Sequence, residues 1–451
     1  MIGNGKRFAV AALALAATLT PAAAAHATPM ASASAVSSAV ASDPGRALDS
    51  IARPLRSAEP GTGTADLHAL GVMVGDAKVV GVGEATHGSH EFFALKDRVF
   101  RYLVEQKGFT TFALEISWSA GLRIDDYLQR GDGDRDARQV VHEAMAGSPW
   151  DREEFATLVQ WMRDHNRRHP DRPVRFLGDD IGAPRLDERV FDSVTDYVRR
   201  TRPESTSRLN ELLTGLRPLD DAIAYLERPL AERQQNAARA KQVLDLAQGQ
   251  RSGGGEDFEF ALQNARNIAQ TYTFLSVDLG DQGSLTAMQR YRDQVMAETT
   301  AWWQRRTGGR VLLSAHNDHA GYAASDPTTY PKTQGSFLRD ALGADYLAIG
   351  TTFDRGSFLS KGQALGGEWK KFTVGPAGPG TNEYTLDQVR YRDYYADLRR
   401  APAAARSWLN IPRPAYSVGT QYPNDKTPEI AIGGTYDVLV HLHTVREADK
   451  L

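Results

Sequence analysis

The sequence predicts an α/β fold: a mostly parallel β-sheet flanked by helices, with an inserted helical subdomain. Three observations lead to this prediction. From residue 77 onward, short apolar runs alternate with longer amphipathic stretches, which is the pattern of repeating βα units. The apolar runs are continuous rather than alternating, as expected for parallel strands that are covered on both faces. A long stretch rich in Arg, Glu, Gln, Leu and Ala separates the third run from the fourth.

Composition sets broad limits on the protein. The chain has 451 residues, of which 41% are hydrophobic and 24% are charged, as in soluble globular proteins. It contains no cysteine, which excludes disulfides, thiolate nucleophiles and cysteine-ligated zinc. The formal net charge is −3 and the two signs of charge are interspersed, so neither nucleic acid nor an anionic membrane is an expected partner.

The first residues are typical of a secretory signal peptide. Lys6 and Arg7 precede a short apolar run, and Ala25-His26-Ala27 offers a cleavage site. We therefore expect a signal peptide at 1–27, with cleavage near Ala27, and a secreted protein. A transmembrane helix is less compatible with so short and Ala-rich a run. Residues 28–44 have the composition of a disordered linker, which leaves the mature domain at 45–451.

Local patterns predict the individual elements. Residues 91–106 place their apolar side chains on one helix face, and Gly108 is a natural stop. The stretch 186–307 is predicted to form several helices, either as structural support or as a wall or lid over a substrate cleft. Pro and Gly are frequent from 366 to 434, where long ordered loops are expected. Strands are predicted at 78–83, 110–117, 173–179, 309–316, 345–353 and 436–444.

Histidines and carboxylates follow four of the predicted strands at the point where each strand ends. They are, in chain order, Glu84, His87, His90, Glu115, Asp180, His316 and His319. In open α/β sheets, ligands bind beyond the carboxyl ends of the strands. Because the chain has only 11 histidines, chance would scatter them more widely. The sequence therefore predicts one shared site at this edge of the sheet.

The residue types at this edge suit the activation of water. A histidine can take a proton from water near neutral pH, and a neighbouring carboxylate fixes its tautomer. Glu84 and His87 are spaced for such a pairing. Glu115, expected on the adjacent strand, could orient the base or position the water. His316 could polarise a carbonyl or protonate the departing alkoxide.

Other chemistries have weaker support in the sequence. No G-x-S-x-G elbow, H-E-x-x-H motif or Walker A loop is present, which argues against a serine triad, a zincin and a phosphate-cradling enzyme. A zinc, manganese or iron site stays open as an alternative. Its ligands would come from His87, His90, His316 and His319, together with Glu84, Glu115 or Asp180.

Several ordered segments resemble the erythromycin esterase family, which includes proteins described as succinoglycan-biosynthesis-like. The segment 79–115 contains the family's G-E-x-T-H-G signature, its following helix and its second Glu. The resemblance extends from about residue 45 to the C-terminus. Further matching segments are WMRDHN (161–166), FLGDDI (176–181), YRDQVMAETTAWW (291–303), SAHNDHA (314–320) and GSFLRDALGADYLAIGTTF (335–353).

The resemblance implies a hydrolase that opens the macrolactone ester of macrolide antibiotics without a metal or other cofactor. By position, it implies that His87 is the general base and that Glu84, Glu115 and His316 complete the catalytic set. Lys96 stands where macrolide-cleaving members carry Arg, so a bidentate contact is in doubt. Thr299 also departs from the usual Asn. Substrate-binding roles are expected for Lys96, Arg98, His90, Asp180 and His319.

The expected function is thus a secreted hydrolase that opens a carboxylic ester or a macrolactone, with a small molecule as its partner. Export and the two departures favour a substrate other than a macrolide. The alternatives are a metal-dependent hydrolase, an acyl transferase on a cell-envelope substrate, and a non-catalytic ligand-binding protein. An apolar cleft could be lined by Trp118, Trp150, Trp161, Trp302 and Trp303, although such aromatic residues more often belong to a core.

Overall fold

The computed structural model describes residues 43–131, 135–249, 255–362, 367–424 and 426–451. The expected signal peptide at 1–27, and the expected linker up to residue 42, lie outside the described residues. Pro44, the last residue of that linker, already belongs to helix α2 (Pro44–Leu48), and Asp43 caps this helix by accepting the Gly45 N–H. Within the described ranges, no helix is both long enough and apolar enough to cross a membrane.

A nine-stranded sheet runs through the centre of the described chain, in the order β1-β8-β11-β6-β2-β5-β3-β4, with β7 paired to β6. The strands are β1 (Ala52–Pro54), β2 (Val79–Val82), β3 (Phe109–Ser117), β4 (Arg175–Asp180), β5 (Arg310–Ser314), β6 (Tyr346–Lys361), β7 (Trp369–Val374), β8 (Tyr394–Asp397) and β11 (Val438–Val445). The six neighbouring strands from β11 to β4 are parallel. They coincide with the six apolar runs, so the prediction of a mostly parallel α/β fold is confirmed.

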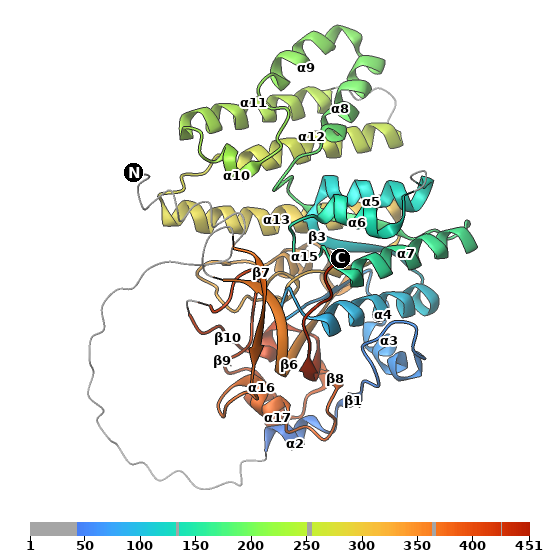
Figure 1. Ribbon diagram of the computed structural model, residues 1–451, viewed down its shortest axis with the longest axis vertical. Helices are drawn as coiled ribbons and strands as arrows, with labels where there is room; N and C mark the ends of the chain where they lie inside the picture. The colour runs from blue at the N-terminus through green and yellow to red at the C-terminus, as the bar shows by residue number, and fades with distance from the viewer. Residues whose placement is uncertain (1–42, 132–134, 250–254, 363–366, 425) are drawn as a thin grey trace.

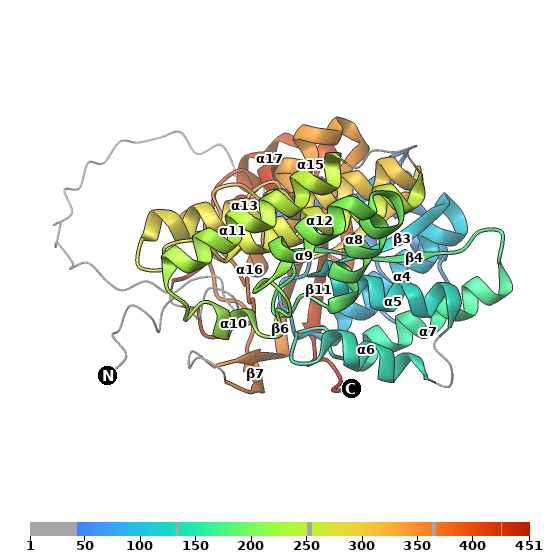
Figure 2. The ribbon, with the colours of Figure 1, turned by 90° about the horizontal axis from the view of Figure 1, so that it is seen from above.

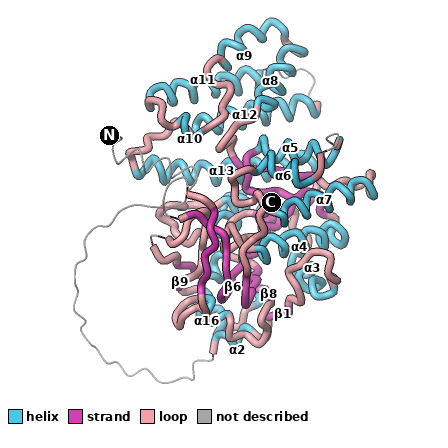
Figure 3. Tube along the Cα trace, viewed as in Figure 1, coloured by secondary structure: helices cyan, strands magenta, loops and turns pink. Residues whose placement is uncertain are grey.

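Helices cover both faces of the sheet, as Figures 1 and 3 show. Successive residues of β2 face opposite cores: Val79 shares one with α13 and α15, and Val80 shares the other with α4 and α7. The helix predicted at 91–106 is α4, and it ends at Gly108 in the left-handed conformation (φ 68°). The helices around the sheet are α3 (His68–Val74), α4 (His90–Lys107), α5 (Trp118–Arg130), α6 (Ala137–Met145), α7 (Glu153–Arg168), α13 (Gln282–Thr307) and α15 (Gln334–Leu342).

A helical layer lies between β4 and α13 in the sequence and stacks above α13 in space (Figures 1 and 2). It comprises α8 (Glu188–Thr201), α9 (Thr206–Leu213), α10 (Ala222–Tyr225), α11 (Leu230–Gly249) and α12 (Glu256–Phe274). Ile223 of α10 and Phe274 of α12 reach the cavity described below. The helical layer therefore contributes two side chains to the wall of this cavity.

The region 366–434 is more regular than the loops expected there. It contains β7, β8, α16 (Asn382–Leu386), α17 (Ala403–Leu409), β9 (Arg413–Pro414) and β10 (Glu429–Ile430). Strand β8 pairs antiparallel with both β1 and β11. Its partners are far away in the sequence, so composition alone gave no signal for this strand.

The strand order corrects one prediction about the site. Glu115 was expected on a strand adjacent to the one that precedes His87. In the structure, β5 lies between β2 and β3. His316, which follows β5, is therefore placed between the segments that carry His87 and Glu115.

Candidate active site

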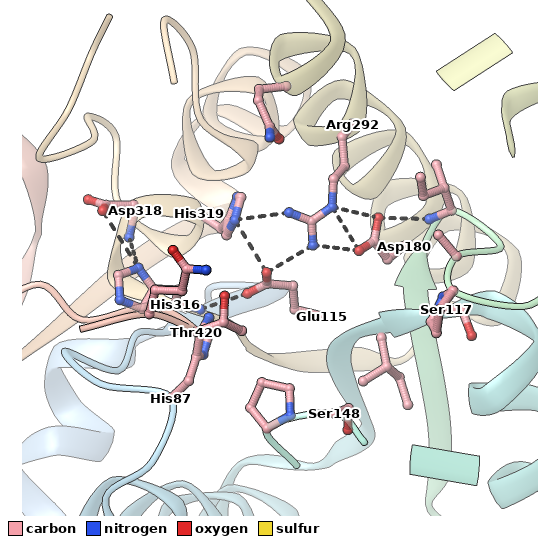
Figure 4. Close-up of a pocket in the computed structure, with 18 of the residues that line it drawn as sticks. His87, Glu115, Ser117, Ser148, Asp180, Arg292, His316, Asp318, His319 and Thr420 are labelled. Carbon is pink, nitrogen blue, oxygen red and sulfur yellow. Dashed lines mark hydrogen bonds and ion pairs between the residues drawn. The ribbon is translucent and has the colours of Figure 1, made fainter. Parts of the chain in front are cut away.

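A cavity of about 710 Å³ lies beyond the carboxyl ends of β2, β5, β3 and β4. Each of these strands, or the segment after it, contributes a lining side chain: His87, His316, Glu115 and Asp180 respectively (Figure 4). Further lining comes from α13, from residues 143–150 and from the segment that begins at Ser417. Residues that are distant in the sequence thus meet in one hollow.

His87 is oriented by the turn that follows β2. Its Nδ1 lies 2.6 Å from Oε1 of the fully buried Glu84. A carboxylate accepts hydrogen bonds, so the proton lies on Nδ1 and the lone pair on Nε2. The turn itself lies against β6, because a Cβ on Gly88 would be 1.9 Å from the Leu359 carbonyl oxygen. His87 is thus held as a proton acceptor beside the cavity.

Lys96 fixes the second oxygen of the same carboxylate. Its Nζ donates to Glu84 Oε2 and, at 3.1 Å, to the Ala315 carbonyl oxygen. Burial alone would raise the pKa of Glu84, but the charge of Lys96 and the contact with His87 hold this pKa below its usual value. Glu84 therefore stays ionised and keeps His87 in one tautomer.

His316 has the opposite tautomer. It caps helix α14 (Asn317–Ala320), where its Nδ1 accepts the backbone N–H of Asp318 at 3.2 Å. The proton must then lie on Nε2, which is buried and has no hydrogen-bond partner among the described residues. Burial and the nearby His87 lower the pKa of His316 to about 4. A neutral imidazole with a free Nε2–H can donate to a carbonyl oxygen or to an oxyanion.

The two histidines stand side by side. Their ring centroids are 4.8 Å apart, and Trp150 packs edge-on against His87 at 5.3 Å. One ring offers a lone pair and the other a proton at the same end of the cavity. This arrangement suits a reaction in which a water molecule loses a proton while a carbonyl gains electron density.

Glu115 forms its hydrogen bond with the backbone of His316 and not with the ring of His87. Its Oε2 accepts the backbone N–H of His316 at 2.9 Å, and its Oε1 lies 3.0 Å from Arg292 Nη2. Arg292 also binds Asp180 at 2.6 Å. Burial would raise the pKa of Glu115, but the charges of His319 and Arg292 hold it well below its usual value. The carboxylate therefore anchors the segment that carries His316.

His319 is a buried cation within this network. Its Nδ1 lies 2.7 Å from Asp293 Oδ1, and its Nε2 lies 3.3 Å from Glu115 Oε1. Burial lowers the pKa of His319, but the two carboxylates outweigh burial and raise it to about 9. The group lines the cavity and stays charged at neutral pH.

The raised pKa of His319 predicts a loss of stability at alkaline pH. The stabilisation that the fold gains from protonated His319 is complete below pH 6.5, and it is lost as the pH rises through 9. Between pH 7 and 10 we expect the free energy of unfolding to fall more for the native protein than for His319→Gln, by about 2 kcal/mol. Urea unfolding of both proteins at the two pH values measures this difference. Equal decreases would show that His319 is not a cation in the fold.

Three residues that were expected to bind substrate lie outside the cavity lining. Lys96 is committed to Glu84, as described above. Arg98 is 1% exposed and forms an ion pair with Asp66. His90 bridges Glu154 and Glu59 at 2.6 and 2.9 Å. All three residues belong to α4, and each is held by contacts with other parts of the protein rather than facing the cavity. Asp180 and His319, by contrast, do line it.

Several lining residues were not predicted from the sequence. Arg292 stands in the middle of α13, and Asp318 lies in α14 between His316 and His319; both belong to segments that resemble the family, but neither was assigned a role in the site. Asp318 accepts hydrogen bonds from Ser325 and Ser417. Of the five tryptophans considered for an apolar cleft, Trp150 lines the cavity and the other four do not.

The ligand geometry does not favour a metal at the histidine pair. Among the described residues, two groups bring three His, Asp or Glu ligand atoms within 4.8 Å of one another. They are His90-Glu154-Asp449 and Asp354-Asp387-His443, and neither contains His87 or His316. The only predicted ligand in either group is His90, which stands apart from the cavity.

The fold and the site define the class of the protein: an α/β protein with a paired-histidine centre suited to hydrolysis. Residues 104–445 match the erythromycin esterase family, so the chain belongs to this family. The matched range includes Glu115, Asp180, Arg292 and the two later histidines, whereas His87 and Glu84 precede it. An erythromycin esterase type II from Escherichia coli is 26% identical over 328 residues, which make up 66% of this chain and 74% of that protein.

Solved structures of similar proteins agree with this family assignment. A protein from Bacillus cereus is 29% identical with a TM-score of 0.82, and the match covers 91% of this chain and 99% of that one. A succinoglycan biosynthesis protein is 28% identical with a TM-score of 0.80, covering 92% and 100%. A mutant of the erythromycin esterase EreC in its open conformation is 17% identical with a TM-score of 0.68, covering 88% and 98%. This last likeness shows the fold alone.

Proposed function

We propose that the protein hydrolyses a carboxylic ester or a macrolactone with water activated by His87. Nε2 of His87 takes a proton from water, whose oxygen forms a bond to the acyl carbon. Nε2–H of His316 stabilises the resulting oxyanion. The bond from the acyl carbon to the alcohol oxygen then breaks, and the proton held by His87 passes to that oxygen. The products are a carboxylic acid and an alcohol.

One observation carries this proposal: the hydrogen bonds that assign opposite tautomers to His87 and His316. Glu84 imposes the first, and the Asp318 backbone N–H imposes the second. Two identical side chains thus become a base and an electrophile, with ring centroids 4.8 Å apart. The names of the relatives support an ester or a macrolactone, and a cavity of about 710 Å³ has the volume of sites for drug-sized ligands.

The test is incubation of the purified protein with macrolides, simpler lactones and acyclic esters, followed by mass spectrometry. We expect at least one substrate to gain one water, or to split into acid and alcohol, and we expect the rate to survive EDTA. Loss of activity in EDTA and rescue by zinc or manganese would support a metallohydrolase. Products that carry an added alcohol acceptor would support an acyl transferase. Tight binding without a product would support a binding protein.

We further propose that the protein acts outside the cytoplasm. The support is Lys6-Arg7, the apolar run after it and the Ala25-His26-Ala27 cleavage site. Expression of the full chain in a secreting host, with the N-terminus determined by mass spectrometry, tests this proposal. A chain that starts near Thr28 and is found outside the cells is expected. An uncleaved chain retained in the cytoplasm would contradict it.

A further inference from the structure

One wall of the cavity offers positive charge without a matching carboxylate. Lys361, at the end of β6, and Trp369, at the start of β7, are directly paired across the two strands and both line the cavity. Nζ of Lys361 lies 5.3 Å from the centroid of the Trp369 ring. Among the described residues, no carboxylate forms an ion pair with Lys361. This lysine is therefore available to a ligand.

Arg152 adds a second cation behind the same wall, although it does not itself line the cavity. It is 5% exposed, and its guanidinium lies 5.2 Å from the centroid of the same Trp369 ring. Nη1 donates to the Asp151 carbonyl oxygen, but Nε and Nη2 are buried without partners in the described chain. A buried guanidinium with two unpartnered nitrogens is unusual, because buried N–H groups cost free energy unless they are satisfied.

The neighbouring acids are engaged elsewhere. Asp151 contacts His142, and Glu154 contacts His90. Burial lowers the pKa of Arg152, although Asp151 and Glu154 oppose this shift, and burial together with Arg152 lowers the pKa of Lys361. An anion bound at Lys361 would therefore stabilise one cation in the wall and a second one, Arg152, behind it.

Four of the acids that line the cavity are paired with arginines. Glu115 and Asp180 are paired with Arg292. Glu143 and Asp187 lie within ion-pair distance of Arg123. Lys361 differs from these arginines in having no such partner in the described part of the chain.

The wall is close to the reacting end of the cavity. The Trp369 indole donates to the Gly147 carbonyl oxygen at 3.4 Å, and the segment after Gly147 leads to Trp150. Trp150 packs against His87 at 5.3 Å, and its own indole N–H is buried without a partner among the described residues. A group bound beside Lys361 can therefore belong to the same molecule as an ester at His87.

We propose that the substrate is an acidic ester, whose carboxylate, phosphate or sulfate group is bound by Lys361 on the wall formed with Trp369 and Arg152. The proposal rests on the ester hydrolysis proposed above and names its substrate class. Lys361 contacts the anion, and Arg152, whose guanidinium also lies against the Trp369 ring, strengthens the positive potential. The aromatic ring of Trp150, which lines the cavity, offers apolar contact to the rest of the molecule.

A pair of chromogenic esters tests the substrate class. Mono-(4-nitrophenyl) succinate and 4-nitrophenyl butyrate share a leaving group and chain length, and only the former carries a carboxylate. We expect Lys361→Met to lower the succinate-to-butyrate ratio of kcat/KM about tenfold or more, chiefly through KM, as is usual for the loss of a charged hydrogen bond. Lys361→Arg should restore most of this ratio. Competition by succinate, inorganic phosphate and inorganic sulfate then ranks the three kinds of anion.

Two further variants complete the design. Lys370→Met removes an exposed charge from β7 outside the cavity and should leave the ratio unchanged. Arg152→Met, checked for an intact fold by thermal unfolding, should lower it. A ratio that is the same in the native protein and in Lys361→Met would overturn the proposal.

Failure of the hydrolase proposal can be recognised separately. If the native protein cleaves neither ester, succinate binding is measured by isothermal titration calorimetry instead. Binding that Lys361→Met abolishes would support the anion site even without hydrolysis. Absent binding, or equal binding to both proteins, would exclude it.

Discussion

Replacement of His87 by alanine is expected to lower kcat for ester hydrolysis by about 10³-fold, because the water then has no base to take its proton. The neighbouring His316 cannot substitute for it. Its Nδ1 is occupied by the Asp318 N–H, and its pKa is lowered to about 4. Steady-state kinetics on whichever ester the panel identifies measures the change.

Substrate binding should survive the same substitution, since His87 is one of many lining residues. Calorimetric titration of His87→Ala with the intact substrate checks this expectation. His68→Ala is the matched control, because His68 is exposed at the start of α3 and should keep the native kcat. Unchanged turnover in His87→Ala would reject the assignment of the base.

The central sheet could be predicted because its signal is local. Each of the six parallel strands is a continuous apolar run, and burial on both faces explains why no alternation appears. The order of the strands could not be predicted in the same way. Pairing of β5 between β2 and β3 depends on contacts between residues that are far apart in the sequence. Glu115 was therefore expected to act on His87, whereas it binds the backbone of His316.

In the candidate site too, the residues with a local sequence signal were predicted, and those placed by long-range contacts were not. Histidines and carboxylates at strand ends were found because parallel strands deliver their carboxyl ends to one edge. Arg292 and Lys361 were missed. Arg292 stands within a long helix, and Lys361 ends a strand whose role in the cavity depends on its antiparallel partner β7. Arg98 and His90 were expected to bind substrate, but they lie outside the cavity lining. Their closeness to His87 in the sequence does not determine the direction in which a side chain of α4 points.

Glu84→Gln is expected to have an effect of similar size to the loss of His87. The amide nitrogen of Gln can donate to Nδ1, which would place the proton of His87 on Nε2 and remove the lone pair that accepts the proton of water. Loss of the correct tautomer lowers kcat by about 10³-fold or more. Kinetics as a function of pH measures it, and a kcat within a few-fold of native would show that Glu84 does not set the tautomer.

The same substitution also leaves Lys96 buried without its counter-ion. Removal of one partner from a buried pair costs about 3 kcal/mol of stability, so Glu84→Gln should unfold at lower urea concentration than the native protein. The double variant Glu84→Gln/Lys96→Met removes both charges and should recover much of this stability while kcat stays low. Stability and turnover would then be separated at one position. Recovery of turnover in the double variant would mean that the loss in Glu84→Gln came from misfolding and that the carboxylate itself is dispensable for catalysis.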